Sequence, residues 1–189
     1  MNIVAVLGSS RSRGNSRRAL DAVLGELEGR GAGVKLHELG RLSSIHPCKG
    51  CDGCRKNKKN ECLQKDDLIA VIEAARRADA ILVAAPVYCF GFNALTQMFF
   101  ERCFYSSEGY EGGPNLLHDK RFGLVLTYGG EDEIDSGARN ALGTFRDSAR
   151  YVGFEIAGIV QGKTPEGLGP DRGMLAECRE LAGRLLRAS

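Results

Sequence analysis

The sequence predicts an α/β domain built on a doubly wound parallel sheet with helices on both faces. Five short apolar runs alternate without interruption with five longer segments of helical period, which is the pattern of a parallel sheet covered by helices. The 189 residues suit one hydrophobic core, so 1–189 is expected to form a single domain. Apolar residues make up 43% and charged residues 26%, which excludes a disordered or fibrous chain.

The first half of the chain is expected to supply three strands and two helices. In chain order these are strand 3–7, helix 16–29, strand 34–39, helix 66–75 and strand 80–85. Gly8 ends the first β-branched run, and apolar residues at i, i+3 and i+4 spacing predict the helix that stops near Gly29. Asp66 can cap the second helix. The third strand is expected to end at Pro86, because proline cannot donate to a central ladder.

The second half continues the alternation. In chain order the expected elements are helix 92–104, strand 122–127, helix 138–151, strand 154–160 and helix 174–186. Phe99, Phe100 and Phe104 lie in the first of these helices and are assigned to the core or to a subunit contact. Glu108 to Asn115 is expected to be a glycine-rich loop. The chain contains no repeat or linker, which agrees with one domain.

The charge balance argues against nucleic acid as a partner. Lys and Arg total 26 against 24 Asp and Glu, a net +2, which is too near balance for the basic field that nucleic-acid binding needs. No apolar run approaches the roughly 18 to 20 residues that span a bilayer, and no secretory signal is apparent. A cytoplasmic protein without membrane contact is therefore expected. Positive charge is concentrated locally, since six basic and two acidic residues lie between His46 and Lys65.

The loop after the first strand, 8–16, is the first candidate binding element. Ligands of doubly wound sheets bind outside the carboxyl ends of the strands, and this hydroxyl-rich loop leads directly onto a helix N-terminus. Backbone amides and the helix dipole favour an anion there. Asn15 stands where a P-loop needs lysine, and Ser10 replaces the second glycine of the dinucleotide pattern. A single terminal phosphate is therefore expected, and the alternative is that Ser and Asn only cap the helix.

The loops after the third and fourth strands are the other candidate elements. Residues 86–91 combine aromatic rings with Gly91, so that backbone groups can bind the polar edge of a flat heterocycle while side chains cover its face. Residues 127–130 end in two glycines, which allow close approach to a ligand. Taken singly, the aromatic residues can be core packing and the glycines a turn. Glu131 to Asp135 carries acidic residues that are expected to form a solvated face rather than catalytic acids.

With these loops, the sequence resembles the NAD(P)H-dependent FMN reductases of the flavodoxin-like superfamily, and among them the iron–sulfur flavoproteins most closely. The likeness covers residues 1 to about 130 and rests on 8–11 with 15–16, the cysteine block, 66–67, 78–88 and 93–102. It implies a flavodoxin-like five-stranded parallel sheet in the order 2-1-3-4-5, with FMN at its carboxyl edge. It also implies subunit contacts that complete the flavin site, in a homodimer or homotetramer.

The resemblance also implies which residues bind FMN. The candidate phosphate-binding residues are Ser9, Ser10, Arg11, Arg13, Asn15 and Ser16. The isoalloxazine ring is expected between Pro86, Val87, Tyr88, Cys89, Phe90 and Gly91 on one side and Thr127, Tyr128, Gly129 and Gly130 on the other. Two residues depart from the family pattern, since Gln97 replaces the usual lysine and Glu101 the usual aspartate. Neither departure lies in the loops expected to hold flavin.

Cys48, Cys51, Cys54 and Cys62 place four thiols within fifteen residues. In a reducing compartment such a block indicates a metal or redox site before it indicates disulfides. Three cysteines at two-residue intervals can hold one face of a 4Fe–4S cluster, and the local positive charge suits the negative charge of that centre. Zinc sites more often use two well-separated pairs, and a chain without any cluster is the other alternative.

The remaining cysteines and histidines give weaker signals. Cys89, Cys103 and Cys178 are scattered through the expected elements and are predicted to be small buried hydrophobic residues. His46 precedes the cysteine block, but a single histidine in a loop is not expected to be a ligand. The candidate metal ligands are therefore the four clustered thiols alone.

These features predict a flavin-dependent oxidoreductase with no catalytic acid or base of its own, because the cofactor supplies the chemistry. FMN is expected to take electrons from NAD(P)H or a ferredoxin-type donor and to pass them to the cluster or to a small acceptor. The cysteine loop follows the second strand, so it is expected at the same sheet edge as the flavin loops. The alternatives are a cluster-free NAD(P)H:FMN or quinone reductase, a flavodoxin-like electron carrier and a zinc-stabilised binding module.

Overall fold

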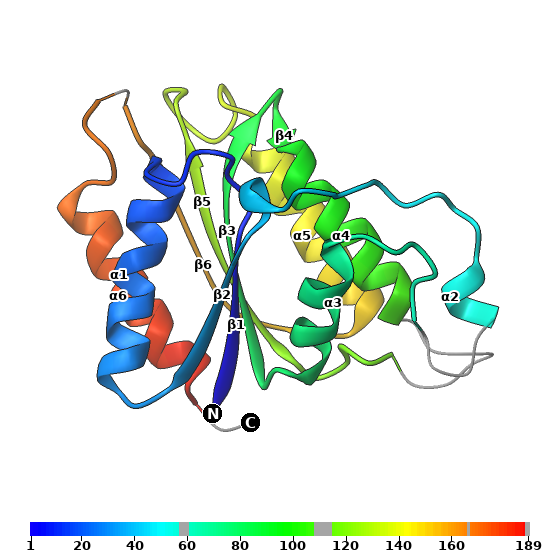
Figure 1. Ribbon diagram of the computed structural model, residues 1–189. Helices are drawn as coiled ribbons and strands as arrows, with labels where there is room; N and C mark the ends of the chain where they lie inside the picture. Colours follow the sequence, from blue (N-terminus) through cyan, green and yellow to red (C-terminus); the bar gives the residue numbers. More distant parts are fainter. Residues whose placement is uncertain (57–60, 108–114, 166, 188–189) are drawn as a thin grey trace.

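The computed structural model describes residues 1–56, 61–107, 115–165 and 167–187. One sheet lies between two layers of helices (Figure 1). One face is covered by α1 (Asn15–Gly29) and α6 (Arg172–Leu185), and the other by α3 (Leu68–Arg77), α4 (Ala94–Ser107) and α5 (Ala138–Val152). Within the described ranges, no helix is both long and apolar enough to cross a bilayer.

Five parallel strands form the sheet in the order β2-β1-β3-β5-β6. Their bounds are β1 (Asn2–Leu7), β2 (Gly33–Glu38), β3 (Ala80–Tyr88), β5 (Arg121–Tyr128) and β6 (Glu155–Lys163). The predicted order needs a correction, because a short strand that was not expected, β4 (Gly91–Phe92), pairs antiparallel with β3. By chain position the order is therefore 2-1-3-5-6 rather than 2-1-3-4-5.

The prediction that the third strand ends at Pro86 is wrong, because β3 continues to Tyr88. On one side, β1 pairs with β3 only as far as Ala84, whose carbonyl accepts a hydrogen bond from the Gly8 amide at 2.8 Å. On the other side, Pro86 lies opposite Thr127 of β5. The missing N–H of Pro86 is directed to the side that β1 has already left. No ladder donor is required there, so the strand continues.

The central strands are mostly apolar because helices cover both of their faces. Residues 80–86 of β3 and 121–127 of β5 are buried, as expected for strands inside a parallel sheet. Phenylalanine rings fill the layer beneath α4 and α5, where Phe100 and Phe104 stack with ring centroids 5.0 Å apart. Phe99 and Phe100 are buried and Phe104 packs against them, which confirms their assignment to the core.

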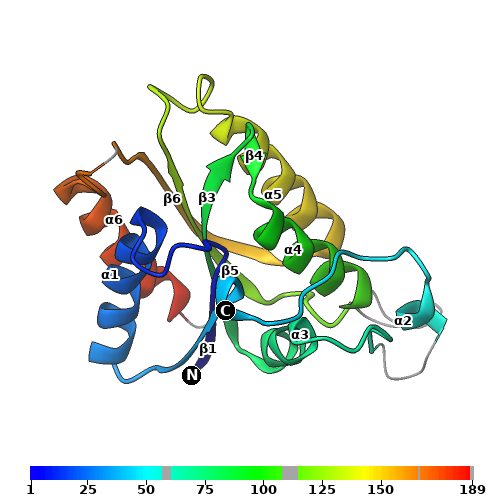
Figure 2. The same ribbon diagram turned by 45° about the horizontal axis from the view of Figure 1, so that its top comes forward.

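Two short elements lie between β2 and α3, where only a loop was expected. The 3-10 turn η1 (Leu39–Arg41) follows β2, and α2 (Gly53–Lys56) lies inside the cysteine block. In both views this segment runs away from the sheet and past α4, with α2 at its far end (Figures 1 and 2). The cysteine block is therefore an excursion from the sheet rather than part of its edge.

Candidate functional site

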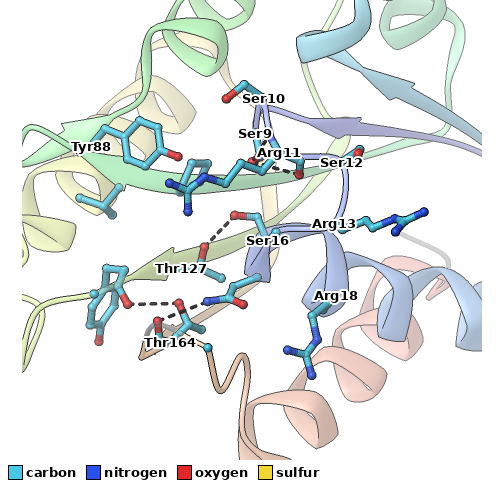
Figure 3. A pocket seen from close by; sticks show the side chains of 17 residues that line it. Ser9, Ser10, Arg11, Ser12, Arg13, Ser16, Arg18, Tyr88, Thr127 and Thr164 are labelled. Atoms are coloured by element: carbon cyan, nitrogen blue, oxygen red, sulfur yellow. Dashed lines mark hydrogen bonds between the residues drawn. The ribbon is translucent and has the colours of Figure 1, made fainter.

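A cavity of ≈ 840 Å³ opens at the carboxyl ends of β1, β3 and β5 (Figure 3). This is the position at which doubly wound sheets bind ligands. It is lined by Ser9, Ser10, Arg11, Ser12, Arg13, Gly14, Asn15, Ser16, Arg18, Pro86, Val87, Tyr88, Thr127, Tyr128, Gly129, Thr164 and Gly167. The structure thus brings together most of the residues predicted to bind cofactor. Cys89, Phe90, Gly91 and Gly130 are not among them.

The loop between β1 and α1 is a tight polar turn at the start of the helix. The buried Ser9 hydroxyl accepts a hydrogen bond from the Arg11 amide at 3.1 Å, and the Gly14 amide donates to the Arg11 carbonyl at 3.1 Å. Gly14 is the N-cap of α1, and no side chain caps the helix. The alternative that Ser and Asn side chains only cap this helix is therefore not what the structure shows. The first amides of α1 can therefore donate hydrogen bonds to an anion in the cavity.

Positive charge surrounds this helix N-terminus. Arg11, Arg13 and Arg18 line the cavity, and among the residues that the structure describes no aspartate or glutamate lines it. The Arg18 guanidinium donates to the Leu168 carbonyl at 3.3 Å, which holds it beside the segment after β6. The first turn of α1 contains no acidic residue either. Helix dipole and arginines together favour a phosphate here.

Hydroxyl and amide contacts join α1 to the strands across the cavity. The Ser16 and Thr127 hydroxyls lie 2.7 Å apart and are buried. The Asn15 side-chain amide donates to the Thr164 carbonyl at 3.3 Å, so this predicted phosphate binder ties α1 to the segment after β6. The Thr164 amide donates to the Tyr128 carbonyl at 2.7 Å. Burial raises the pKa of the Tyr128 phenol, which therefore stays neutral and able to donate.

The β3 wall of the cavity ends in a two-residue hairpin turn. Residues 86–88 line the cavity, and Cys89 and Phe90 form the turn to β4. Both turn residues have positive φ, 49° and 62°, a conformation that suits a type I′ hairpin but costs energy outside Gly, Asn and Asp. The Asn140 side chain of α5 donates to the Phe90 carbonyl at 3.0 Å and holds the turn. Cys89 is exposed at this tip, so its predicted burial is wrong.

Sequence reasoning missed five residues of the cavity wall: Ser12, Gly14, Arg18, Thr164 and Gly167. Ser12 and Gly14 lie inside the predicted phosphate loop, so their position in that loop was enough to predict that they line the cavity. Arg18 lies one helical turn after Gly14. A basic residue on the first turns of a helix that follows a candidate phosphate loop could also have been predicted to line the site. Thr164 and Gly167 follow the edge strand β6, and no motif marks them.

The first turn of α4 and the residue before it fix the start of loop 8–16. The buried Asn93 side chain donates to the Gly8 carbonyl at 2.6 Å and accepts from the Thr96 hydroxyl at 2.6 Å. A Cβ on Gly8 would lie 1.9 Å from the Thr96 hydroxyl oxygen, so only glycine fits. Gln97 and Glu101, the two departures from the family pattern, contact each other at 3.4 Å and do not line the cavity.

The cysteine segment is the insertion expected at about 46–65, and its described residues lie at the other end of α4 (Figures 1 and 2). The Cys54 sulfur is 4.0 Å from the carbonyl of Tyr105, which follows the first residue of α4 by eleven positions, or about 16 Å of helix. The segment does leave β2 at the carboxyl edge of the parallel sheet, as expected, but within one chain its thiols do not stay beside the loops of the cavity. The excursion that carries α2 places the thiols beyond α4 instead.

The clustered cysteines are all free thiols, of which Cys51 is exposed and the others are half-buried. Burial, together with the neighbouring thiols of Cys62 and Cys48, raises the pKa of Cys54. Thiols of this kind, near basic residues, have the donor chemistry that a thiophilic metal centre needs. Among the described residues, however, no three His, Cys, Asp or Glu side chains are arranged to hold a metal ion. The four thiols thus fit such a centre by their chemistry, although they are not arranged around one point in this structure. Lys58 and Lys59 of the basic block lie outside the described residues.

Residues 1–153 match the family model of the NADPH-dependent FMN reductases. The chain belongs to the NADPH-dependent FMN reductase family. FMN is the cofactor that the family implies. The cavity fits the phosphate of FMN by its own features, namely an uncapped helix N-terminus and three arginines among its described lining residues.

Curated relatives of this chain carry two kinds of name. An iron–sulfur flavoprotein of Archaeoglobus fulgidus is 35% identical over 131 residues, which cover 69% of this chain and 56% of the relative. An iron–sulfur flavoprotein of Methanosarcina thermophila is 27% identical, with 84% and 78% covered. An FMN-dependent NADH:quinone oxidoreductase of Leptothrix cholodnii is 30% identical, with 65% and 59% covered. The matches to three Archaeoglobus fulgidus relatives span only 50% to 60% of those proteins.

Solved structures support the same fold. An NAD(P)H:quinone oxidoreductase from Methanothermobacter marburgensis has a TM-score of 0.74 at 17% identity, with 100% of this chain and 98% of that chain covered. An FMN-dependent NADH-azoreductase from Bacillus anthracis has a TM-score of 0.70 at 13% identity, with 99% and 100% covered. Identities this low show a shared flavodoxin-like fold and no more.

Proposed function

We propose that this member of the FMN reductase family binds FMN in the cavity and transfers electrons from NAD(P)H to a small acceptor. One observation carries the proposal: the α1 N-terminus has no side-chain cap and opens into an ≈ 840 Å³ cavity whose described lining residues include three arginines. A phosphate satisfies the free amides there. The names of the quinone and azo reductases among the structural neighbours support a nicotinamide donor.

In this proposal the chain positions the cofactor rather than taking part in the chemistry. The first amides of α1 and the Arg11 guanidinium bind the phosphate, and the Ser16–Thr127 hydroxyl pair keeps α1 against β5. The Tyr88 side chain, which lies in the cavity wall, covers one face of the ring (Figure 3). Gly129 has open space around it and allows close approach on the other side. Bound FMN supplies hydride acceptance, so no side-chain acid or base is required.

Titration of the full chain with FMN and with riboflavin tests this proposal. Riboflavin has the same ring and lacks the phosphate, so FMN is expected to bind at least about tenfold more tightly. Quenching of flavin fluorescence measures both affinities. Equal affinity for the two flavins would contradict a phosphate site at the α1 N-terminus.

Anaerobic reduction tests the donor. NADPH or NADH is expected to bleach the absorbance of bound FMN, and comparison of the two rates assigns the preferred nicotinamide. Reduction by a ferredoxin-type protein without reduction by either nicotinamide would instead favour the flavodoxin-like electron carrier.

The proposal also includes a homodimer or homotetramer. Size-exclusion chromatography with light-scattering detection measures the mass of the assembly and tests this part.

We propose in addition that the cysteine segment holds a 4Fe–4S cluster. The support is the set of four free thiols within fifteen residues, three of them half-buried, and the names of the iron–sulfur flavoproteins among the relatives. Chain isolated anaerobically is expected to contain iron and sulfide in equal amounts, about four of each, and to absorb in the visible range. Zinc in place of iron, or no metal with quinone reduction retained, would reject the cluster and leave the flavin proposal standing.

A further inference from the structure

Arg102 is a buried arginine of α4 that the flavin chemistry does not use. Its side chain has no exposed surface, and its Nη1 lies 2.5 Å from Oδ2 of Asp66, whose side chain is 1% exposed. Burial opposes ionisation of this carboxyl, but Arg102 and His46 lower its pKa. A buried pair of this kind adds little net stability compared with apolar residues, and it is costly to break. Its presence is better explained by what the pair holds together.

The Arg102 guanidinium holds both arms of the cysteine segment. On the outgoing arm, the His46 carbonyl accepts a hydrogen bond from Nη1 at 3.1 Å. On the returning arm, the Gln64 carbonyl accepts from Nη2 at 3.5 Å. Asp66 joins the two arms directly, because its Oδ2 accepts from the His46 amide at 3.1 Å across a separation of 20 residues. The segment that carries the four cysteines is therefore closed at one point on α4.

The same guanidinium reaches a sulfur. Nη2 of Arg102 lies 3.6 Å from Sγ of Cys62, the last of the clustered cysteines. An arginine presents several N–H groups in one fixed plane, so it can serve two carbonyls, a carboxylate and a sulfur together, which the single ammonium of lysine cannot do. Hydrogen bonds from outside the ligand set orient metal ligands, and their loss typically weakens metal binding about 10- to 100-fold.

We propose that Arg102 is a positioning residue for the cysteine segment, which pins both arms to α4 and donates a hydrogen bond to the Cys62 sulfur. The ion pair with Asp66 and the hydrogen bonds to the His46 and Gln64 carbonyls close the arms whether or not a metal is bound. The role toward a bound centre rests on the proposed function, in which the four thiols ligate one thiophilic centre.

Cadmium binding to the full chain, prepared anaerobically and free of metal, tests the positioning role. Cd²⁺ is the probe, and the charge-transfer absorbance of thiolate-bound cadmium is the signal. Arg102→Lys keeps the positive charge and loses the planar fork, so its Cd²⁺ affinity is expected to fall about 10- to 100-fold. Arg76→Lys is the matched control, because Arg76 is also buried, with 5% side-chain exposure, and donates to the Ser107 hydroxyl of α4 at 3.3 Å. The control is expected to bind Cd²⁺ within about twofold of the unchanged chain.

Limited proteolysis provides a readout that needs no metal. Trypsin is expected to cut after Lys49, Arg55 and Lys56 about tenfold faster in Arg102→Lys, because release of the arms opens the segment locally. Arg76→Lys is expected to leave those cuts at their original rate. Asp66→Asn keeps the arginine and removes its charge partner, and it tests the same closure if Arg102→Lys does not fold.

Cd²⁺ affinity and segment cleavage that both stay unchanged in Arg102→Lys would overturn the proposal. FMN titration of the same samples reports separately on the cavity at the other end of α4. A failure of the flavin proposal and a failure of the Arg102 proposal therefore appear in different measurements.

Discussion

The cavity at the strand ends and the cysteine segment are built in opposite ways, although α4 contacts both. The cavity forms where β1, β3 and β5 end, so neighbouring strands hold its loops, and Asn93 fixes Gly8 at 2.6 Å. The cysteine segment leaves the sheet and is fastened near one buried pair, Arg102 and Asp66. A site built into strand order follows from the fold, whereas a site carried on an excursion depends on a few specific contacts.

The largest effect is expected for Asp66→Ala. Removal of the carboxylate leaves the Arg102 charge buried without its partner, so the free energy of unfolding is expected to fall by about 3–5 kcal/mol. Urea unfolding followed by circular dichroism measures the loss. The control is Asp67→Ala, because the exposed Asp67 accepts hydrogen bonds from the Ser43 and Ser44 amides, worth about 1–2 kcal/mol. Equal losses in the two variants would show that the buried pair is not the main fastening.

Gly8→Ala is expected to have the next largest effect and to act on the cavity. The new Cβ would meet the Thr96 hydroxyl oxygen at 1.9 Å, so the loop must shift, at a cost of about 1–3 kcal/mol in the free energy of unfolding. FMN affinity is expected to fall with it, because the phosphate loop begins at this residue. Gly25→Ala on α1 meets nothing within 4 Å and is expected to gain up to about 1 kcal/mol. Unchanged FMN affinity in Gly8→Ala would show that the loop adapts without the anchor.

These contrasts also explain what the sequence could predict. Buried apolar runs and helical spacing predict the five parallel strands and the five helices that cover them. Each predicted end lies within three residues of the observed end. That loop 8–16 lines a cavity at the sheet edge followed from its place after the first strand. The hairpin tip did not follow, because Cys89 and Phe90 adopt positive φ against Asn140 of a distant helix. Two-residue hairpin turns with positive φ prefer Asn, Asp and Gly, so Cys and Phe at these positions do not predict such a turn.

The closure around Arg102 was beyond sequence reasoning for a similar reason. Asp66 is 36 residues away from Arg102, and its more obvious role was to cap a helix. In the structure Asp67 is the N-cap of α3, without a side-chain cap bond, and Asp66 pairs with the arginine instead. A long-range pair of two ionised side chains has no period to detect, so only the folded chain identifies it.

A smaller effect is expected for Arg11→Ala. The exposed Arg11 guanidinium lines the cavity, and loss of one charge-assisted contact to the phosphate is expected to weaken FMN binding about tenfold, or about 1.4 kcal/mol. Riboflavin affinity is expected to stay the same, because riboflavin has no phosphate. Arg41→Ala is the control, since Arg41 pairs with Glu38 at 3.0 Å and does not line the cavity. A parallel loss of riboflavin affinity would mean that Arg11 shapes the cavity rather than binding the anion.

The smallest effect at neutral pH is expected from the two cysteines inside the helix layers. Cys103 and Cys178 are buried as predicted, and burial raises their pKa values to about 12 and about 11. An unfolded thiol ionises near pH 8.5, so below that pH these groups leave the stability unchanged. Above it the unfolded chain releases protons that the folded chain retains, and stability is expected to fall as the pH rises toward the folded pKa values.

Urea unfolding between pH 7 and 11 measures this dependence. The double variant Cys103→Ala, Cys178→Ala is expected to reduce its slope, whereas Cys89→Ala, at the exposed hairpin tip, is expected to leave the slope as it was. Iodoacetamide at pH 8 is expected to modify Cys89 and to spare Cys103. Cys103 lies in α4 between the Asn93 anchor and the end of the helix beside the cysteine segment. Rapid modification of Cys103 in the folded chain would therefore mean that α4 opens, and a rigid α4 could no longer be the common support of both sites.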